Sequence, residues 1–415
     1  MADPSNENRR YDVVVFGATG FTGGLVVEYF AEHHTRRDVR WAIAGRNSER
    51  LHELRDRILA SHPTLDPPPV VVADSKDPDS LNAMAASTKV VCTTVGPYAR
   101  YGAPLVAACI EQGSHVVDLT GEPQFVRHSV DSFHEAAVEA GVRVVHCCGF
   151  DSIPSDLGTR LLQDAVIARD GRPCDEIKLF VVDLRGAVSG GTIESMVGLM
   201  EAARSPAVRR ILGDPYALNP AGDRHGPDRR EPLGPDRDPL AQTWTAPFVM
   251  AAINSRVVRR TNALLDFPYG RSFRYQEVMA TGSGAMGWLR AASSALGLGL
   301  FLAGMRFDPS RALLRRWVLP EPGRGPSRAR MEAGRFAMRL SARRDGSEVG
   351  SCVVRGSRDP GYLATAGMIA EAAVHLASDE EGSRCQAGVL TPVTGLGPAI
   401  TARLERAGLE FELQV

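Results

Sequence analysis

The chain lacks the cysteine pattern and the leader segment that mark several classes of protein. No C-x-x-C pair occurs among its seven cysteines, so the sequence indicates neither a metal site such as zinc nor a redox pair. Because the count is odd and the cysteines are scattered in mostly apolar sequence, we expect buried thiols in a reducing cytoplasm. The first ten residues contain no apolar core of a signal peptide, which argues against secretion.

An excess of charge and one familiar catalytic pair are also missing. Basic and acidic residues nearly cancel, 48 against 49, so no global field points to nucleic acid or to a strongly charged partner. None of the eight tyrosines has a lysine four residues later, which excludes the Tyr-x-x-x-Lys dyad of short-chain dehydrogenases. The composition, 44% hydrophobic and 23% charged over 415 residues, is that of an ordinary globular protein with length enough for two domains.

Glycine, in contrast, is concentrated where the ordered sequence begins. Residues 13–16 are β-branched or aromatic and predict a buried parallel strand, and apolar residues recur at helical spacing over 25–30. The turn between them needs backbone that a Cβ would block, and the helix start that follows offers N–H groups to a pyrophosphate. We therefore predict dinucleotide binding by this turn, whose G-x-x-G-x-x-G spacing is common where NADP is bound. Its residues are Gly17, Ala18, Thr19, Gly20, Phe21, Thr22 and Gly23.

The end of the second expected strand distinguishes NADP from NAD. Residues 39–44 are largely apolar and are followed by Gly45, Arg46 and Asn47. NAD-specific folds place a carboxylate here for the ribose 2′-hydroxyl, whereas a guanidinium suits a 2′-phosphate by charge and fork geometry. We therefore expect NADP(H); the alternative is an arginine that is merely solvated at a helix start. A third strand ends at Asp74, which would either meet the adenine edge or cap the next helix.

Three further strand-like segments complete a six-stranded, doubly wound sheet up to about residue 155. They lie within residues 89–102, 115–122 and 143–158. Ligands of such sheets bind outside the carboxyl ends of the strands, so the end of the first of these segments should lie near the nicotinamide. Its residues there are Thr94, Val95, Gly96, Pro97 and Tyr98.

The sequence that follows indicates a second domain of mixed structure. Residues 176–184 predict a strand, and Asp345-Gly346 is a hairpin signal within an alternating segment. Residues 205–240 are rich in Pro, Gly, Asp and Arg and predict a mobile surface loop. Helices are expected at 364–377 and after Gly395.

We therefore predict an α/β protein with a Rossmann-type doubly wound parallel sheet and an inserted α+β domain. The expected NADP-binding domain covers residues 1–160, and the substrate or dimerisation domain covers 161–355. A C-terminal helical segment, 356–415, is expected to return to the first domain and pack on it.

An apolar segment followed by a basic one, together residues 278–344, leaves three alternatives open. Arg290 is the only charge between Val278 and Met305, and residues 306–344 contain eleven arginines against three acidic residues. The uncharged stretch 291–305 is too short to cross a bilayer of about 30 Å. It is either a buried helix before a solvated basic face, a helix on an anionic membrane surface, or the wall of an acyl-chain tunnel whose mouth attracts an acidic carrier protein.

The ordered set of motifs resembles the saccharopine dehydrogenase family, in particular its actinobacterial trans-acting enoyl reductase branch. The resemblance implies a Rossmann domain, an inserted α/β domain and a C-terminal segment that packs back on the first. It also implies reduction of a carbon–carbon double bond in a polyketide-derived lipid, in trans to a synthase that lacks this activity. The motifs are DVVVFGATGFTG, AIAGRN, TTVGPYARYG, VVDLTGE, CCGFDSIPSDLG, DPGYLATAGMIAEAA and GVLTPVTGLG.

Few residues stand out as candidates for the proton transfer that alkene reduction needs beside the hydride. Tyr98 is the first candidate for proton donor or for a hydrogen bond to the carbonyl, the alternative being that it packs against the nicotinamide ring. Asp151 and Ser152 would orient the substrate, or would form a helix cap and turn. His146 lies in an apolar strand, where a satisfied core histidine is favoured over a catalytic one.

Two other functions stay open beside the enoyl reductase. One is reductive C–N chemistry on an amino acid, as saccharopine dehydrogenases perform, and the other is an NADP-binding protein on a lipid surface without turnover. As partners we expect a lipid-like enoyl substrate, presented by an acyl carrier or polyketide synthase, and a second copy in a homodimer. We expect no nucleic acid and no metal. The expected location is the cytoplasm, with peripheral contact at the inner face of the cell membrane as one alternative.

Overall fold

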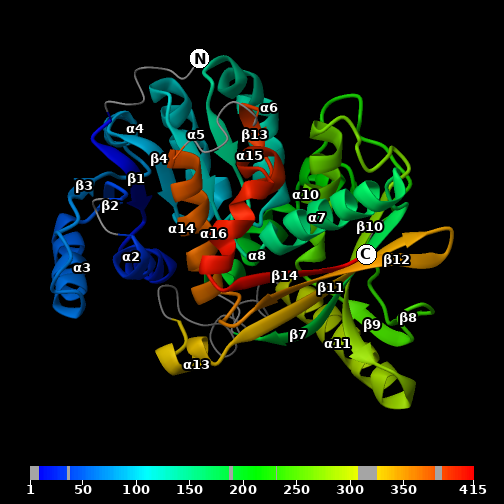
Figure 1. Ribbon diagram of the computed structural model, residues 1–415. Coiled ribbons are helices and arrows are strands. Elements are labelled where there is room, and N and C mark those ends of the chain that lie inside the picture. The colour runs from blue at the N-terminus through cyan, green and yellow to red at the C-terminus, as the bar shows by residue number, and fades with distance from the viewer. Residues whose placement is uncertain (1–8, 35–37, 187–189, 230, 307–324, 379–385) are drawn as a thin grey trace. The chain divides into compact units, whose positions relative to one another are not determined.

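The computed structural model describes residues 9–34, 38–186, 190–229, 231–306, 325–378 and 386–415, which form two compact units (Figure 1). The first unit comprises Met1–Ile153, Gly323–Gly325 and Gly361–Gly408, and the second Pro154–Pro322, Pro326–Pro360 and Leu409–Val415. The chain therefore leaves the first unit at residue 153 rather than 160. Its last residues, 409–415, belong to the second unit and not, as expected, to the first, because they form a strand of that unit's sheet.

The first unit is built on a sheet of parallel strands in the order β13-β6-β5-β4-β1-β2-β3. Apart from β13, this is the doubly wound order of dinucleotide-binding folds. The sequence predicted six strands, and the seventh comes from the C-terminal segment, where Val389 pairs with Val144. The strands are β1 (Tyr11–Phe16), β2 (Trp41–Gly45), β3 (Val70–Val72), β4 (Thr88–Thr93), β5 (His115–Asp118), β6 (Arg143–Val145) and β13 (Gly388–Leu390).

Helices follow each of the first six strands, and the C-terminal segment adds one long helix that is buried. This helix, α14, packs against α2 and against β1, β4 and β5, and all its residues from Leu363 to Ala377 are buried (Figure 1). A helix that is apolar on every side needs such a position. The helices of the unit are α2 (Phe21–His33), α3 (Ser48–Ser61), α4 (Pro78–Ala86), α5 (Tyr98–Gln112), α6 (Pro123–Glu139), α14 (Leu363–Ser378), α15 (Pro392–Leu396) and α16 (Thr401–Arg406), while α7, after β6, runs on into the second unit.

The second unit contains a mixed sheet in the order β14-β12-β11-β7-β10-β9-β8. β7 and β10 are parallel, and the other neighbours are antiparallel. The strands are β7 (Glu176–Arg185), β8 (Asp236–Asp238), β9 (Thr243–Pro247), β10 (Arg274–Gly282), β11 (Arg335–Arg344), β12 (Ser347–Gly356) and β14 (Leu409–Gln414). The helices are α7 (Ile153–Asp170), α8 (Gly190–Ala202), α9 (Pro206–Gly213), α10 (Ala251–Leu264), α11 (Gly284–Arg306) and α13 (Arg328–Glu332).

The predicted surface loop at 205–240 contains more ordered structure than its composition suggested. It holds α9 and β8, and Tyr216, Ala217 and Leu218 are buried between them. The cause is α10, whose arginines donate hydrogen bonds to backbone carbonyls of this segment: Arg256 Nε to Asp214 O at 3.0 Å, Arg259 Nη1 to Pro215 O at 3.2 Å and Arg260 Nη1 to Leu218 O. These bonds satisfy carbonyl groups that burial would otherwise leave unpaired.

The cysteines within the described residues are buried and carry no disulfide. Burial raises the pKa of the Cys92 thiol well above its ordinary value and that of the Cys109 thiol to about 12, so these thiols are unreactive near neutral pH. Cys385 lies outside the described residues.

The hairpin between β11 and β12 turns through Asp345 and Gly346, as the sequence predicted. Their φ angles are 51° and 77°, which fits the positive-φ pair of a two-residue turn. We expect Gly346→Ala to destabilise the protein by about 1–2 kcal/mol, because an L side chain is strained at this φ. Thermal unfolding of the variant should show a midpoint lowered by several degrees.

Gly234→Ala is the matched control for this substitution. Gly234 has no positive φ, and an added Cβ there would meet no neighbouring atom within 4 Å. Its midpoint should therefore stay at the wild-type value. An equal midpoint for Gly346→Ala and wild type would contradict the strain argument.

Candidate active site

The turn after β1 contains two glycines at which an added Cβ would come too close to neighbouring atoms. Gly17 has a φ of 89°, and a Cβ placed on it would lie 2.8 Å from Val95 Cγ2 and 2.9 Å from Thr94 Oγ1. A Cβ on Gly23 would collide with the carbonyl group of Gly17 and would also approach Thr94 Oγ1 to 2.9 Å. Both positions therefore require glycine for steric reasons.

The same turn leaves backbone donors at the start of α2 without an acceptor. The N–H groups of Gly17 and Ala18 bond to the Ala44 carbonyl at 3.0 and 3.1 Å. Within the part of the chain that the structure describes, the N–H groups of Phe21 and Thr22 bond to no protein atom, and the N-cap residue Gly20 supplies no side-chain cap. Free N–H groups and the helix dipole at this end suit the pyrophosphate of a dinucleotide.

Arg46 follows β2 at the carboxyl edge of the same sheet. Its side chain is exposed, and its guanidinium makes no hydrogen bond or ion pair within the described ranges. Asn47 beside it is the N-cap of α3, since its Oδ1 accepts a hydrogen bond of 3.0 Å from the Arg50 N–H. The structure therefore leaves the Arg46 guanidinium available for a phosphate, whereas the side chain of Asn47 already caps α3.

Asp74 makes a local turn rather than a helix cap. Its Oδ1 accepts a hydrogen bond of 3.0 Å from the Lys76 N–H. The N-cap of α4 is instead Asp77, whose Oδ1 accepts from the Asp79 N–H at 3.2 Å. The sequence offered two interpretations of Asp74, a helix cap and a contact with adenine. The first is wrong, because the cap of α4 is Asp77, three residues later. The contact with adenine stays a prediction.

The end of β4 lies against the glycine turn, and the expected position of residues 94–98 near the nicotinamide stays a prediction. The Thr94 N–H donates to the Phe16 carbonyl at 3.0 Å, and the Val95 N–H donates to Thr93 Oγ1 at 3.2 Å. The Gly96-Pro97 peptide bond is cis, and Pro97 is the N-cap of α5. The structure therefore brings 94–95 and 17–23 together.

Tyr98 is buried, and its hydroxyl group is already bound within the protein. The hydroxyl donates to the Thr93 carbonyl at 3.2 Å and accepts from the Leu119 N–H at 3.2 Å. Its ring stacks on Phe125, with centroids 6.1 Å apart. Burial raises the pKa of the Tyr98 phenol well above its ordinary value, with the charge of Asp118 as a smaller cause. This geometry favours packing over proton donation.

Asp151 differs from Tyr98 in its exposure and in its hydrogen bonding. Its side chain is partly exposed at the turn that follows β6, and the structure gives its carboxyl group no side-chain partner among the described residues. Burial raises the pKa of Asp151 to about 7, and the nearby charge of Asp118 also raises it. Ser152 is fully buried, and its N–H donates to the Gly149 carbonyl at 3.3 Å. At this pKa about half of the Asp151 carboxyl groups carry a proton at neutral pH, and Ser152 anchors the turn.

His146 is a core residue with both ring nitrogens bound. Its Nδ1 lies 2.7 Å from Asp118 Oδ2, and its Nε2 lies 2.9 Å from Ser129 Oγ. All three side chains are buried. The Asp118 Oδ1 accepts from the Thr120 and Cys147 N–H groups at 3.0 and 3.2 Å. These side chains hold β5, β6 and α6 together and are not open to a substrate.

Sequence reasoning missed the role of Glu122. This buried carboxylate accepts hydrogen bonds from the Tyr98 and Ala99 N–H groups, at 3.0 and 2.9 Å, and so satisfies the start of α5. A negative charge is favourable at a helix N-terminus. The sequence holds no local signal of this contact, because Glu122 and Tyr98 are separated by the whole of α5 and β5.

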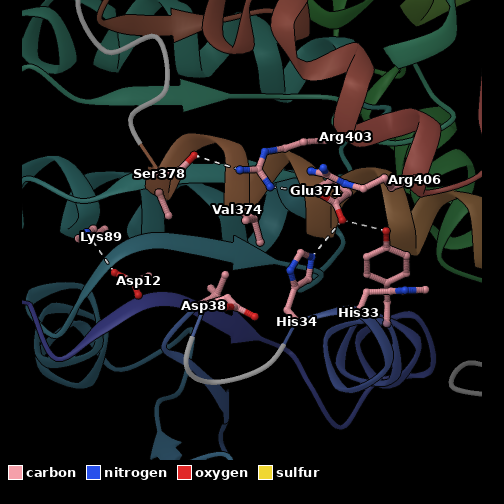
Figure 2. A pocket seen from close by; sticks show the side chains of 13 residues that line it. Asp12, His33, His34, Asp38, Lys89, Glu371, Val374, Ser378, Arg403 and Arg406 are labelled. Carbon is pink, nitrogen blue, oxygen red and sulfur yellow. Dashed lines mark hydrogen bonds and ion pairs between the residues drawn. The ribbon is translucent and has the colours of Figure 1, made fainter.

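A cavity of about 520 Å³ lies at the opposite edge of the sheet (Figure 2). Asp12 and Lys89, near the starts of β1 and β4, form an ion pair of 3.0 Å there. Glu371 of α14 lies 3.0 Å from His34 Nε2 and accepts a hydrogen bond of 2.9 Å from the Tyr29 hydroxyl (Figure 2). Since the strands are parallel, this edge is the one far from the glycine turn, and its acidic groups are paired with protein cations and donors. It is not the nucleotide site.

Among the described residues, no group of three or more His, Cys, Asp and Glu side chains could hold a metal ion. The glycine turn, the free donors of α2 and the unpaired Arg46 define a dinucleotide-binding site that fits NADP(H). Residues 13–145 match the family model described as the saccharopine dehydrogenase NADP binding domain. The protein is therefore, by class, an NADP-dependent oxidoreductase.

Comparison with whole chains gives the family. The trans-acting enoyl reductase of Mycobacterium tuberculosis is 40% identical over 98% of this chain and 98% of its own length, and that of Mycobacterium leprae is 38% identical over the same shares. The solved saccharopine dehydrogenase (L-Glu forming) of Saccharomyces cerevisiae matches 97% of this chain and 99% of its own with a TM-score of 0.50 at 13% identity, which shows the fold. This chain belongs to the trans-acting enoyl reductases of the saccharopine dehydrogenase family.

The Arg46 guanidinium should give the site a preference for NADPH over NADH, which can be measured. We expect Arg46→Ala to weaken NADPH binding about 10- to 100-fold, the loss of a charge-assisted hydrogen bond to phosphate, and to leave NADH binding nearly unchanged. Dissociation constants for both coenzymes, measured by fluorescence titration, test this.

Arg50→Ala is the control for Arg46→Ala, because Arg50 is also exposed, near the start of α3, and its substitution removes the same charge. It should change NADPH binding by less than Arg46→Ala does. If both coenzymes weakened equally in Arg46→Ala, the assignment of the 2′-phosphate to this residue would be wrong.

Proposed function

We propose that this protein reduces the carbon–carbon double bond of an enoyl group in a polyketide-derived lipid, with NADPH as the reductant. The observation that carries the proposal is the 40% identity to trans-acting enoyl reductases, which extends over nearly the whole chain and so through both units. An NADP-binding fold alone would be compatible with many reactions. Similarity through the second unit supports a common substrate class as well.

The residues of the first unit fit the coenzyme half of this reaction. NADPH, when bound, supplies the hydride that reaches the β-carbon of the enoyl group. The free N–H groups of Phe21 and Thr22 would hold its pyrophosphate, and Arg46 its 2′-phosphate. Thr94 and Val95 border the turn on the side where the strand ends.

Asp151 fits the role of proton donor in this reaction. The α-carbon needs a proton, and a carboxyl group with a pKa of about 7 still carries one in a large share of molecules at neutral pH. An ordinary aspartic acid, with a pKa near 3.9, would be ionised. We therefore assign the role of proton donor to the Asp151 carboxyl group. Tyr98, whose hydroxyl is bound to Thr93 and Leu119, keeps the site in shape.

The manner of substrate delivery is part of the proposal. The relatives are named as acting in trans, which describes work beside a separate synthase. We extend this to the present chain, with the enoyl group presented as a thioester on an acyl carrier or polyketide synthase. Assembly into a homodimer, which the sequence led us to expect, also belongs to the proposal.

A panel of substrates tests the reaction. We expect a long-chain enoyl thioester to support NADPH oxidation with formation of the saturated thioester, identified by mass spectrometry, whereas the ketone of the same chain does not. Turnover only with an amino acid and an oxo acid would instead indicate C–N chemistry of the saccharopine type. Binding of NADPH without turnover on any member would indicate the non-catalytic alternative.

Asp151→Asn tests the proton donor. We expect kcat to fall about 100- to 10,000-fold, the usual contribution of a positioned acid, with the dissociation constant of NADPH unchanged. The wild-type kcat should decline as pH rises through about 7, because the donor loses its proton there, and the variant should lose this pH dependence.

Tyr98→Phe is the matched comparison for Asp151→Asn. Its kcat should stay within about tenfold of wild type, because the hydroxyl it loses bonds only to backbone groups of Thr93 and Leu119 and stabilises the fold. A loss of kcat in Tyr98→Phe as large as that in Asp151→Asn would reverse the two assignments.

A further inference from the structure

Helix α11 is long, apolar and exposed. Its stretch Gly284–Met305 has the length and composition of a helix that could cross a membrane, yet only 11% of its most apolar window is buried (Figure 1). The sequence left open whether residues 291–305 form a buried helix, lie on an anionic membrane surface or line an acyl-chain tunnel. Burial, the simplest of those alternatives, is contradicted by this exposure.

Small residues attach the first turns of α11 to the sheet of the second unit. Gly287 and Ala291 are buried, and a Cβ on Gly287 would collide with the Gly282 carbonyl. Thr281 Oγ1 donates to the Gly287 carbonyl at 2.9 Å. One face of α11 therefore packs on the sheet, and the exposed large side chains lie on another face of the helix.

Those large side chains form an outward stripe, which we define as Met286, Leu289, Leu296 and Leu300. Their spacing of three, seven and four residues places them on one side of the helix. Leu296 and Leu300 are each 64% exposed, and Trp288 near the helix start is 47% exposed. A continuous apolar surface of this kind is costly in water and marks a contact site.

We propose that the outward stripe of α11 inserts into the surface of an anionic lipid bilayer. Between Ala291 and Met305 the helix has no ionisable side chain, and the Ser293 hydroxyl donates to the Leu289 carbonyl of the same helix at 2.8 Å. All of this surface can therefore enter hydrocarbon without leaving a charge there.

Charge near the start of the helix selects the kind of lipid. Arg290, in the first turns, is exposed and has no acidic partner among the described residues. The sequence 306–344 has eleven arginines against three acidic residues. Five of the arginines that the structure describes there pair with acidic side chains of the protein, namely Arg328, Arg335, Arg339, Arg343 and Arg344, so the preference for an anionic surface rests on Arg290. A positive charge beside an apolar helix complements phosphatidylglycerol and similar headgroups. Trp288 is of the type that settles at the interface between headgroups and chains.

The connections of α11 favour insertion from one side over spanning. The strand before it, β10, and the strand after it, β11, belong to one sheet with only β7 between them. Both ends of the helix therefore return to the same unit, as in a helix that lies in the interface. A second copy of the chain is the competing occupant. Protein interfaces of specific dimers carry a polar rim and hydrogen bonds, for which the stripe offers no groups.

The test compares binding to vesicles of phosphatidylcholine with and without phosphatidylglycerol. We expect the full chain to co-sediment with the anionic vesicles, and Leu296→Glu/Leu300→Glu to lower its partition coefficient at least about 100-fold, since burial of each leucine contributes about tenfold or more. The matched control is Leu233→Glu/Leu413→Glu, which adds the same charge at two other exposed leucines of the second unit and should bind like wild type.

Tryptophan fluorescence shows whether α11 itself enters the bilayer. Addition of anionic vesicles should shift the emission to the blue, and Trp288→Phe should lose this shift while still binding. Unchanged NADPH binding in every variant shows that the first unit, which holds the coenzyme residues, stays folded. A thermal unfolding midpoint equal to that of the wild type shows the same for the second unit, which holds the substituted residues.

Two outcomes would overturn the proposal. One is wild-type protein that stays in the supernatant, or that binds no better than Leu296→Glu/Leu300→Glu. The other is a wild-type dimer in sedimentation equilibrium that becomes monomeric in the glutamate variant without any vesicle binding, which would assign α11 to a second copy. The proposal does not depend on the reaction proposed above, and neither outcome bears on turnover with soluble substrates.

Discussion

The close approach of the first turn to the end of β4 is the constraint on which the site depends. Gly17 and Gly23 lack side chains at the two points where Thr94 Oγ1 comes near both of them. This contact holds the start of α2 close to the turn, where the N–H groups of Phe21 and Thr22 have no acceptor among the described residues. It also fixes where the chain leaves β4, and therefore where Tyr98 and Glu122 meet at the start of α5.

The parts of the molecule that follow local rules could be predicted from sequence. The apolar run 13–16, the glycine turn and the Asp345-Gly346 hairpin each have a cause within a few residues, and the structure contains all three. The candidate coenzyme residues share this property, since the start of a helix and the end of a strand are set by neighbouring sequence. For that reason the family resemblance and the physical argument agreed on the class of coenzyme.

Features that depend on distant partners could not be predicted in the same way. Strand β13 has only three residues, and it forms because its backbone pairs with β6 at the edge of the sheet. Strand β14 belongs to the second unit because it pairs with β12, a strand of that unit. The same holds for function. In the sequence Tyr98 was the first candidate for the proton donor, and Asp151 was expected to orient the substrate or to form a cap and turn. Only the bonds of the Tyr98 hydroxyl group and the environment of the Asp151 carboxyl group favour the reverse assignment.

Two apolar helices of this chain show what distinguishes burial in protein from exposure. Helix α14 is buried along nearly its whole length, and it carries Glu371 and His375, whose side chains bond to Tyr29 and to the Leu396 carbonyl. Polar groups inside a protein core persist when partners of fixed position satisfy them. Helix α11 has no ionisable residue between Ala291 and Met305, although much of it faces outward. A helix adapted to a protein partner would be expected to use such groups for specificity, whereas a helix adapted to hydrocarbon has to omit them. The omission in α11 is therefore itself an argument for lipid.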